Sequence, residues 1–215
     1  MDELSQETNV SVCYFGDLVK SATVQATPVY QSWLPKILSL VSHDANDVRQ
    51  SVAYALGALA EKNPEVMSPV LEDSLTALLQ MSSAEDSREE ENVLVTQNAL
   101  SAIGKILQFH SANVHVASHL PTWISFLPPP ISEDDDNCEI GVIYKQLCHF
   151  TASAGSHLPL VLSALVNAIE DPSLLDEQTR TDIVKEIQRM QSQSPNQMQD
   201  ALQSLSPQLQ GKFPF

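Results

Sequence analysis

Apolar residues recur at helical spacing along most of the chain. Between residues 30 and 63, two such stretches are separated by the polar turn at 42–46, and Pro35 is expected in the opening turn of the first. The apolar stripe of the first stretch consists of Trp33, Leu34, Ile37, Leu38 and Val41, and that of the second consists of Val48, Val52, Leu56 and Leu59. A period near 3.6 residues in two neighbouring segments predicts a helical hairpin.

The second helix of this hairpin recurs further along the chain. The segment VRQSVAYALG at 48–57 aligns without a gap to VTQNALSAIG at 95–104, so that Val95 takes the place of Val48, about 47 residues earlier. Periods of about 40–47 residues are typical of HEAT and armadillo units. Glycines at matched places predict close approach of neighbouring helices. The sequence therefore predicts an all-α fold, an α-α superhelix of the HEAT or armadillo-like solenoid type with about five helical hairpins.

A proline next to leucine or valine accompanies the start of each first helix, as in Leu34-Pro35 and Leu120-Pro121. We expect one HEAT-repeat array over residues 1–215, and the unpaired apolar helix at its start predicts a piece of a longer array, because natural ends are usually polar caps. The expected parts are an orphan helix at 8–23, hairpins at 29–63, 66–110, 117–154 and 157–191, and a C-terminal helix with a tail at 195–215. Within the hairpins, second helices are expected near 47–62, 90–109, 138–153 and 176–191.

The chain is strongly acidic, with 27 Asp and Glu against 11 Lys and Arg and a formal net charge of -16. Nucleic acids and anionic membranes are recognised through basic surfaces, so neither is an expected partner. A basic protein segment is the partner that this field would attract, whereas the alternative reading is an acidic surface that only keeps the protein soluble. The three cysteines show no CxxC spacing and fit a reducing compartment.

Two acidic connections each precede an expected second helix: EDSREEE at 85–91 and EDDD at 133–136. Carboxylates at a helix N-terminus complement the helix dipole, which explains part of each run as solvated turns. The other reading is direct contact with a basic partner. That reading makes four residues candidates for cargo binding: Glu89, Glu90, Asp135 and Asp136.

No catalytic or cofactor-binding pattern is present. Cys148 and His149 are neighbours that point about 100° apart on a helix and so do not share a proton easily. His110, His115 and His119 lack a cysteine or an acid to complete a metal site. The loop at 134–139 lacks the glycine that a calcium loop needs. The sequence predicts a binding protein that is not an enzyme and has no cofactor and no metal.

Three segments carry a family resemblance. WLPKILSLVSHDANDVRQSVAYALGALAEKN at 33–63 resembles a HEAT repeat. DVRQSVAYALGALA at 47–60, ENVLVTQNALSAIGKIL at 91–107 and HLPTWISFLP at 119–128 are similar, in that order, to the closing repeats of karyopherin-β (importin-β) nuclear import receptors. The subgroup most resembled carries ribosomal proteins and histones, and the resemblance covers residues 10–170.

The resemblance implies the C-terminal portion of a receptor that shuttles between cytoplasm and nucleus, with basic cargo on a negative surface lined by second helices. Ran-GTP and nucleoporins are implied as partners only through a longer parent chain. The alternative is a HEAT scaffold subunit of a stable phosphatase or chromatin-associated complex. Positions opposite the buried stripes of two second helices are further cargo-binding candidates: Gln50, Tyr54, Glu61, Gln97, Ser101 and Gln108.

Overall fold

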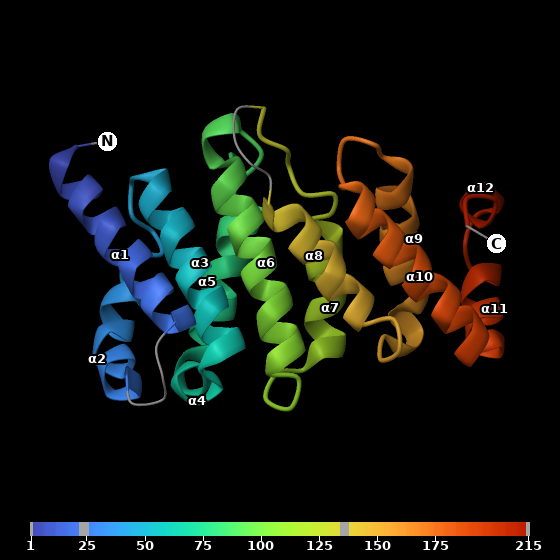
Figure 1. Cartoon of the computed structure of the whole chain (residues 1–215), viewed down its shortest axis with the longest axis horizontal. Helices are drawn as coiled ribbons and strands as arrows, with labels where there is room; N and C mark the ends of the chain where they lie inside the picture. The colour runs from blue at the N-terminus through green and yellow to red at the C-terminus, as the bar shows by residue number, and fades with distance from the viewer. Residues whose placement is uncertain (1, 22–25, 134–137, 214–215) are drawn as a thin grey trace. The chain divides into compact units, whose positions relative to one another are not determined.

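A computed structural model of the chain describes residues 2–21, 26–133 and 138–213, and every regular element among them is a helix (Figure 1). The prediction of an all-α fold is therefore confirmed. The chain divides into two compact units. Unit 1 comprises Met1–His115 with Pro129–Asn137, and unit 2 comprises Val116–Pro128 with Cys138–Phe215.

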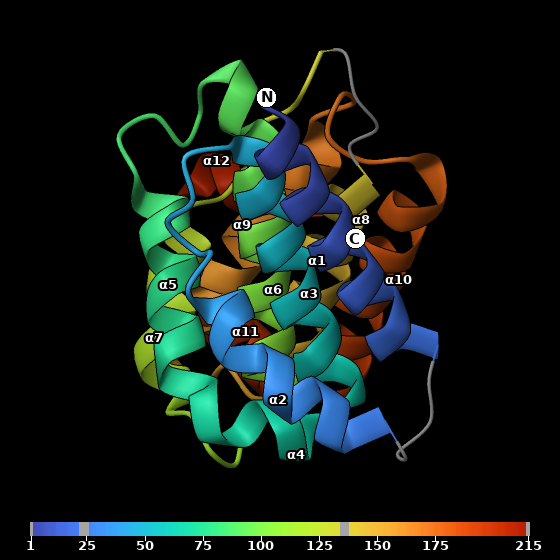
Figure 2. The same cartoon turned by 90° about the vertical axis from the view of Figure 1, so that its left-hand side faces the viewer.

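Unit 1 is built around α3 (Asn46–Lys62), which packs between α1 (Glu3–Ser21) and α6 (Val93–Phe109). These three helices lie side by side in Figure 1. On their other side, α5 packs on α6, and α2 contacts both α1 and α4 (Figure 2). The bounds of these helices are Thr27–Leu38 for α2, Pro64–Met67 for α4 and Leu71–Ser83 for α5.

The α3–α6 contact is the tightest part of this core. The predicted stripe of α3 is fully buried at Val48, Val52, Leu56 and Leu59. A methyl group added to Gly57 would lie 3.2 Å from both Cα and Cβ of Ala102, on α6. The close helix approach that the glycine predicts is therefore confirmed at this position, since a larger side chain would push α6 away.

At the start of the chain, α1 and α2 are joined by aromatic side chains. Phe15 is fully buried and packs edge-on against Tyr30, with ring centroids 5.8 Å apart. The Tyr30 hydroxyl donates a hydrogen bond to the carbonyl of Leu18 at 2.8 Å. Two boundary predictions are wrong here, because α1 begins at Glu3 rather than residue 8, and Pro35 lies inside α2 rather than in its opening turn.

In unit 2, α8, α9 and α10 contact one another, α7 packs on α9, and α11 packs on α9 and α10. Trp123 of α7 is fully buried, with its ring centroid 6.0 Å from that of Phe150. The helix bounds are Val116–Ser125 (α7), Cys138–His149 (α8), Leu158–Glu170 (α9), Glu177–Gln193 (α10), Pro195–Gln203 (α11) and Pro207–Gln210 (α12).

Short 3-10 turns interrupt the elements where single helices were expected. The expected first helix of the second hairpin is divided into α4, a 3-10 turn at Ser68–Val70 and α5. Pro64 opens α4 and Pro69 lies in the 3-10 turn, and each lacks the amide hydrogen that an unbroken helix would need. Two further 3-10 turns, Glu90–Asn92 and Gly155–His157, precede α6 and α9.

Candidate protein-binding surface

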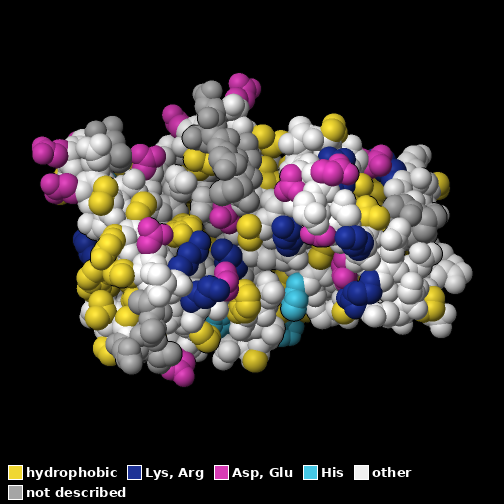
Figure 3. Space-filling view, in the orientation of Figure 1, with side chains coloured by type: hydrophobic (Ala, Val, Ile, Leu, Met, Phe, Trp, Pro, Cys, Tyr) yellow, Lys and Arg dark blue, Asp and Glu magenta, His cyan; other side chains and the backbone are white. Residues whose placement is uncertain are grey.

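The connections between the helices of unit 1 carry a group of exposed carboxylates, which we call the acidic edge. Hydrogen bonds described below join the α2–α3 connection, the α5–α6 connection and residues 129–133, and Figure 1 shows these segments at one end of the unit. Acidic side chains are visible along this edge in Figure 3. Its exposed members are Asp44, Asp47, Glu85, Asp86, Glu89, Glu90, Glu91 and Glu133.

Arg49 is the centre of the hydrogen-bond network behind this edge. Its Nη1 donates to the carbonyls of His43 at 2.7 Å and Asp44 at 3.0 Å. Its Nη2 donates to the side-chain oxygens of Asn46 at 2.8 Å and Asn92 at 2.7 Å. A single guanidinium thus fixes the end of the α2–α3 connection against the end of the α5–α6 connection, because its donors are held in a rigid fork.

Two asparagines and a glutamate complete the network. Asn46 donates to the carbonyl of Glu91 at 2.7 Å, and Asn92 donates to the carbonyl of Asp86 at 3.2 Å. The Glu90 carboxylate accepts from the Ser132 hydroxyl at 2.7 Å, so Glu90 has a structural partner as well as an exposed position. Glu89 is exposed, whereas the candidates Asp135 and Asp136 lie outside the described residues.

Three candidates lie partly exposed on α3: Gln50, Tyr54 and Glu61. The Tyr54 hydroxyl donates to Asp17 of α1 at 3.3 Å, and the Lys20 ammonium lies 4.2 Å from the centroid of the Tyr54 ring. Glu61 pairs with its neighbour Lys62 at 2.6 Å. The α1–α3 surface is thus a mixture of both charges.

The position of two candidates on α6 contradicts the helical-wheel prediction. Gln97 is 1% exposed and donates through its side-chain amide to the carbonyl of Pro130 at 2.9 Å. Ser101 is 2% exposed, and its hydroxyl oxygen is buried without a hydrogen-bond partner. The prediction that Gln97 and Ser101 lie on an exposed face is wrong. Gln108, near the end of the same helix, is partly exposed.

The charge of the expected second helices is nearly balanced. These helices (α3, α6, α8 and α10) and the orphan helix α1 together carry nine acidic residues: Glu3, Glu7, Asp17, Asp47, Glu61, Glu139, Glu177, Asp182 and Glu186. They also carry eight of the 11 basic residues of the chain: Lys20, Arg49, Lys62, Lys105, Lys145, Arg180, Lys185 and Arg189. Figure 3 shows Lys and Arg gathered over α3 and α6. The expected negative surface on the second helices is therefore wrong, because the excess of acid lies mainly on connections and other helices.

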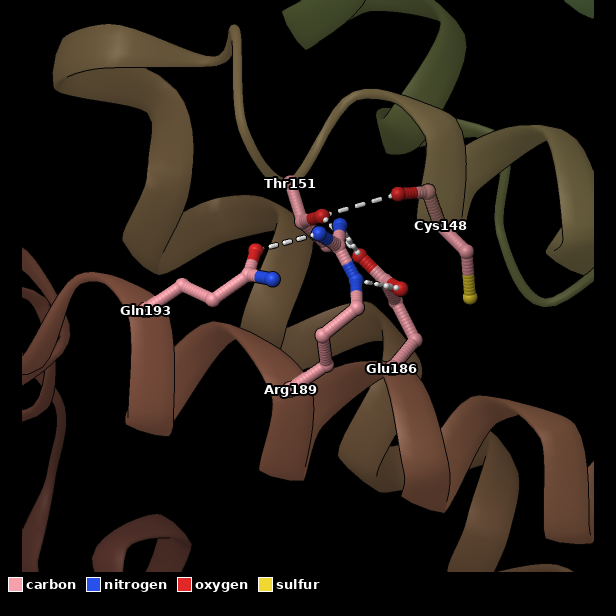
Figure 4. Close-up of polar contacts among 5 residues, drawn as sticks. All are labelled: Cys148, Thr151, Glu186, Arg189 and Gln193. Atoms are coloured by element: carbon pink, nitrogen blue, oxygen red, sulfur yellow. Dashed lines mark hydrogen bonds and ion pairs between the residues drawn. The ribbon is translucent and has the colours of Figure 1, made fainter.

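A polar cluster in unit 2 ties the turn after α8 to α10 (Figure 4). The Thr151 hydroxyl lies 2.8 Å from Oε1 of Glu186 and 2.9 Å from the carbonyl oxygen of Cys148, so two acceptors share its proton. Arg189 binds both carboxylate oxygens of Glu186, at 2.6 and 2.7 Å, and also donates to Gln193. These Arg189 hydrogen bonds hold the pKa of Glu186 below its usual value.

The structure argues against nucleophilic chemistry at Cys148. Burial, with a smaller contribution from the carboxylates of Glu186 and Asp182, raises the pKa of the Cys148 thiol to about 12. The thiol is therefore protonated at neutral pH and is a poor nucleophile. Across residues 2–21, 26–133 and 138–213, no three His, Cys, Asp or Glu side chains gather as a metal site would require. In the same part of the chain, no helix has the length and apolarity needed to cross a membrane.

Arg180 of unit 2 has a role that the sequence interpretation missed. It is the fourth residue of α10, as Arg49 is the fourth residue of α3. Its guanidinium donates to the carbonyl of Ile169 at 2.5 Å and to those of Asp171 and Leu175, each at 3.3 Å. The sequence signal was a basic residue in the first turn of a second helix, where the dipole disfavours a positive charge.

Comparison with known proteins agrees with this architecture. The family model "HEAT repeat" matches residues 34–62. Importin subunit beta-3 of Saccharomyces cerevisiae is 26% identical over 170 residues, which are 77% of this chain and 16% of that protein. A probable importin-5 homolog of Dictyostelium discoideum is 24% identical over 145 residues, 64% of this chain and 13% of the relative. The chain therefore spans about one sixth or less of the length of these relatives.

The fold is also found in a solved structure. The crystal structure of Kap121p bound to RanGTP superposes with a TM-score of 0.61 and 21% identity, over 92% of this chain and 18% of that chain. This likeness establishes the helical solenoid class that the repeat pattern predicts. The HEAT match and the two importin relatives make the chain similar to proteins of the importin-β family.

Proposed function

We propose that this chain is a C-terminal HEAT-repeat portion of a nuclear import receptor and that it binds basic segments of cargo proteins, such as ribosomal proteins or histones. The importin relatives, which match up to 77% of the chain, support the receptor role. Such a receptor would shuttle between cytoplasm and nucleus, and would contact Ran-GTP and nucleoporins through the rest of a longer chain. The function is binding, without catalysis.

The acidic edge of unit 1 is the observation that supports a basic partner. Its carboxylates are exposed, and the backbone behind them is fixed by Arg49, Asn46 and Asn92. A rigid array of like charges attracts an oppositely charged segment without first having to be ordered, which lowers the entropic cost of binding. Glu89 and Glu90 belong to this edge, and the partly exposed Gln50, Tyr54, Glu61 and Gln108, with Asp135 and Asp136, remain predicted contacts.

Isothermal titration of the 215-residue chain with a lysine-rich histone or ribosomal-protein tail tests this function. The triple variant E85Q/E89Q/E91Q removes three exposed charges of the acidic edge. At about 0.5 kcal/mol for each exposed ion pair, binding should weaken about tenfold. Raising the salt concentration should reduce the affinity of the original chain more than that of the variant.

A matched control separates local contact from net charge. The variant E65Q/E72Q/D73N removes three exposed carboxylates from α4 and α5, outside the acidic edge. Its affinity should stay within about twofold of the original. Equal weakening by both variants would mean that only net charge matters, and no binding of the original chain even at low salt would refute a basic partner for this portion.

A further inference from the structure

Unit 2 contains a cavity of about 300 Å³ with a polar side and an apolar side. The apolar walls include Leu127 and Pro128, which follow α7, and Leu174, in the loop between α9 and α10. The polar groups come from three places in the unit: Tyr144 of α8, Asn167 of α9 and Asp171, which directly follows α9. A cavity of this size is at the small end of the range for ligand pockets and suits one long side chain.

The Tyr144 hydroxyl is a polar group without a partner. The residue is 1% exposed, yet its hydroxyl makes no hydrogen bond with any of the described residues. Burial, with a smaller contribution from the nearby Asp171 carboxylate, raises the pKa of this phenol, so the group stays neutral and can accept or donate a hydrogen bond. The hydroxyl oxygen is not among the fully enclosed unpaired atoms of the described residues, and Tyr144 lines the cavity, so a ligand or water there can complete its hydrogen bonding.

Asp171 supplies the charge. Its Oδ1 accepts two hydrogen bonds from Ser173, from the backbone N–H at 2.9 Å and from the hydroxyl at 2.6 Å. These bonds hold the pKa of the Asp171 carboxyl below its usual value, so the group is ionised at neutral pH. Both end on Oδ1, and Oδ2 has no donor among the described residues. Arg180 donates to the backbone carbonyl of Asp171 rather than to this carboxylate.

The geometry favours an ammonium over a guanidinium. An arginine fork needs two parallel acceptors, whereas Asp171 has one oxygen already engaged by Ser173. A lysine ammonium has three donors that rotate freely, and three residues that line the cavity carry acceptor oxygens: Asp171, Tyr144 and the exposed Asn167. The four-carbon stem of lysine would cover the apolar walls, as such stems do elsewhere. The C-terminal end of α9 adds a favourable dipole.

We propose that this cavity of unit 2 binds the side chain of a lysine from a basic protein segment, with the ammonium between Asp171, Tyr144 and Asn167. This inference rests on the proposed function only because both assume that the partner is a basic protein segment. It names a site that is separate from the acidic edge of unit 1.

The test uses two peptides and the full chain. One peptide is a ten-residue segment with a single lysine, and the other replaces that lysine by norleucine, which keeps the stem and removes the charge. Nuclear magnetic resonance of the ¹⁵N-labelled chain should show shifts of the Asn167 side-chain amide with the lysine peptide only. Isothermal titration should show at least tenfold weaker binding of the norleucine peptide.

Variants of the chain complete the test. Asp171→Asn keeps the Oδ1 acceptor for Ser173 and should weaken the lysine peptide about tenfold, and Tyr144→Phe should weaken it two- to fivefold. Asp200→Asn removes an exposed carboxylate of α11 and should have no effect. Equal affinity for the two peptides, or unchanged binding by Asp171→Asn, would overturn the lysine site. If the lysine site fails this test but histone or ribosomal-protein tails still bind the acidic edge, the proposed function stands. If the single-lysine peptide binds the cavity but the tails do not bind the chain, only the proposed function is refuted.

Discussion

Replacing Arg49 by methionine should destabilise unit 1, because Arg49 makes four hydrogen bonds between 2.7 and 3.0 Å. A hydrogen bond to a charged group contributes about 1.5–3 kcal/mol to stability. Such contributions are not additive, and Arg49 is partly exposed, so water replaces part of what is lost. We therefore expect a loss of about 2–4 kcal/mol in the free energy of unfolding of unit 1.

Urea unfolding measures the loss in free energy, and hydrogen exchange shows in which helices it occurs. In Arg49→Met, the amides of α3 and α6 should exchange faster, whereas those of α10, in the other unit, should keep their original rates. Lys62→Met is the matched control, since it removes a cation from the same helix. The ion pair of Lys62 with Glu61 is partly exposed and contributes little to stability. Its effect should stay below about 0.5 kcal/mol.

Lysine at position 49 gives a second comparison. It keeps the charge but cannot reproduce the fork that joins His43 to Asn92, so Arg49→Lys should recover less than half of the lost stability. Arg49→Met could lower the free energy of unfolding no more than Lys62→Met, or could accelerate amide exchange equally in both units. Either result would refute the conclusion that the hydrogen bonds of Arg49 hold the connections of the acidic edge together.

Three further predictions follow from the packing and the pKa shifts. Gly57→Leu should separate α3 from α6 and cost about 1–3 kcal/mol in urea unfolding, despite the better helix propensity of leucine, because Ala102 leaves no room; an unchanged midpoint would contradict this. Iodoacetamide at pH 8 should alkylate Cys148, whose pKa is raised to about 12 by burial, far more slowly than the exposed Cys13, as followed by mass spectrometry. Burial lowers the pKa of His110, so the stability that its neutral ring contributes is present above about pH 6.5 and is lost as the pH falls; His110→Gln should flatten the pH dependence of the unfolding midpoint.

The sequence pattern predicted the helices because most apolar stripes are local properties of the chain. The expected second helix at 47–62 and the observed α3, Asn46–Lys62, differ by one residue at the start. The matched glycine at 57 also predicted a tertiary contact, because only a small residue tolerates a helix at that distance. Prolines were less informative, since Pro35 and Pro121 lie inside helices whose starts the pattern placed too late.

Candidate binding residues were harder to predict, because exposure depends on segments that return from elsewhere in the chain. The helical wheel of α6 shows Gln97 opposite the apolar stripe, and it contains no information that Pro130, far along the chain, accepts a hydrogen bond from it. The same limit affected charge. Net charge says nothing of placement, and the placement of Lys and Arg on the second helices depends on which helices form one layer.

The hydrogen bonds that hold the acidic edge in place do not depend on most of its carboxylates, so the charge of this edge can change during evolution. Arginine, asparagine and backbone carbonyls hold the loops in place, and most of the surrounding carboxylates are not needed for this. Glu90 is an exception, because it anchors Ser132. Related proteins could therefore exchange acidic for neutral residues here and acquire new binding partners while the hydrogen-bonded backbone beneath keeps its shape.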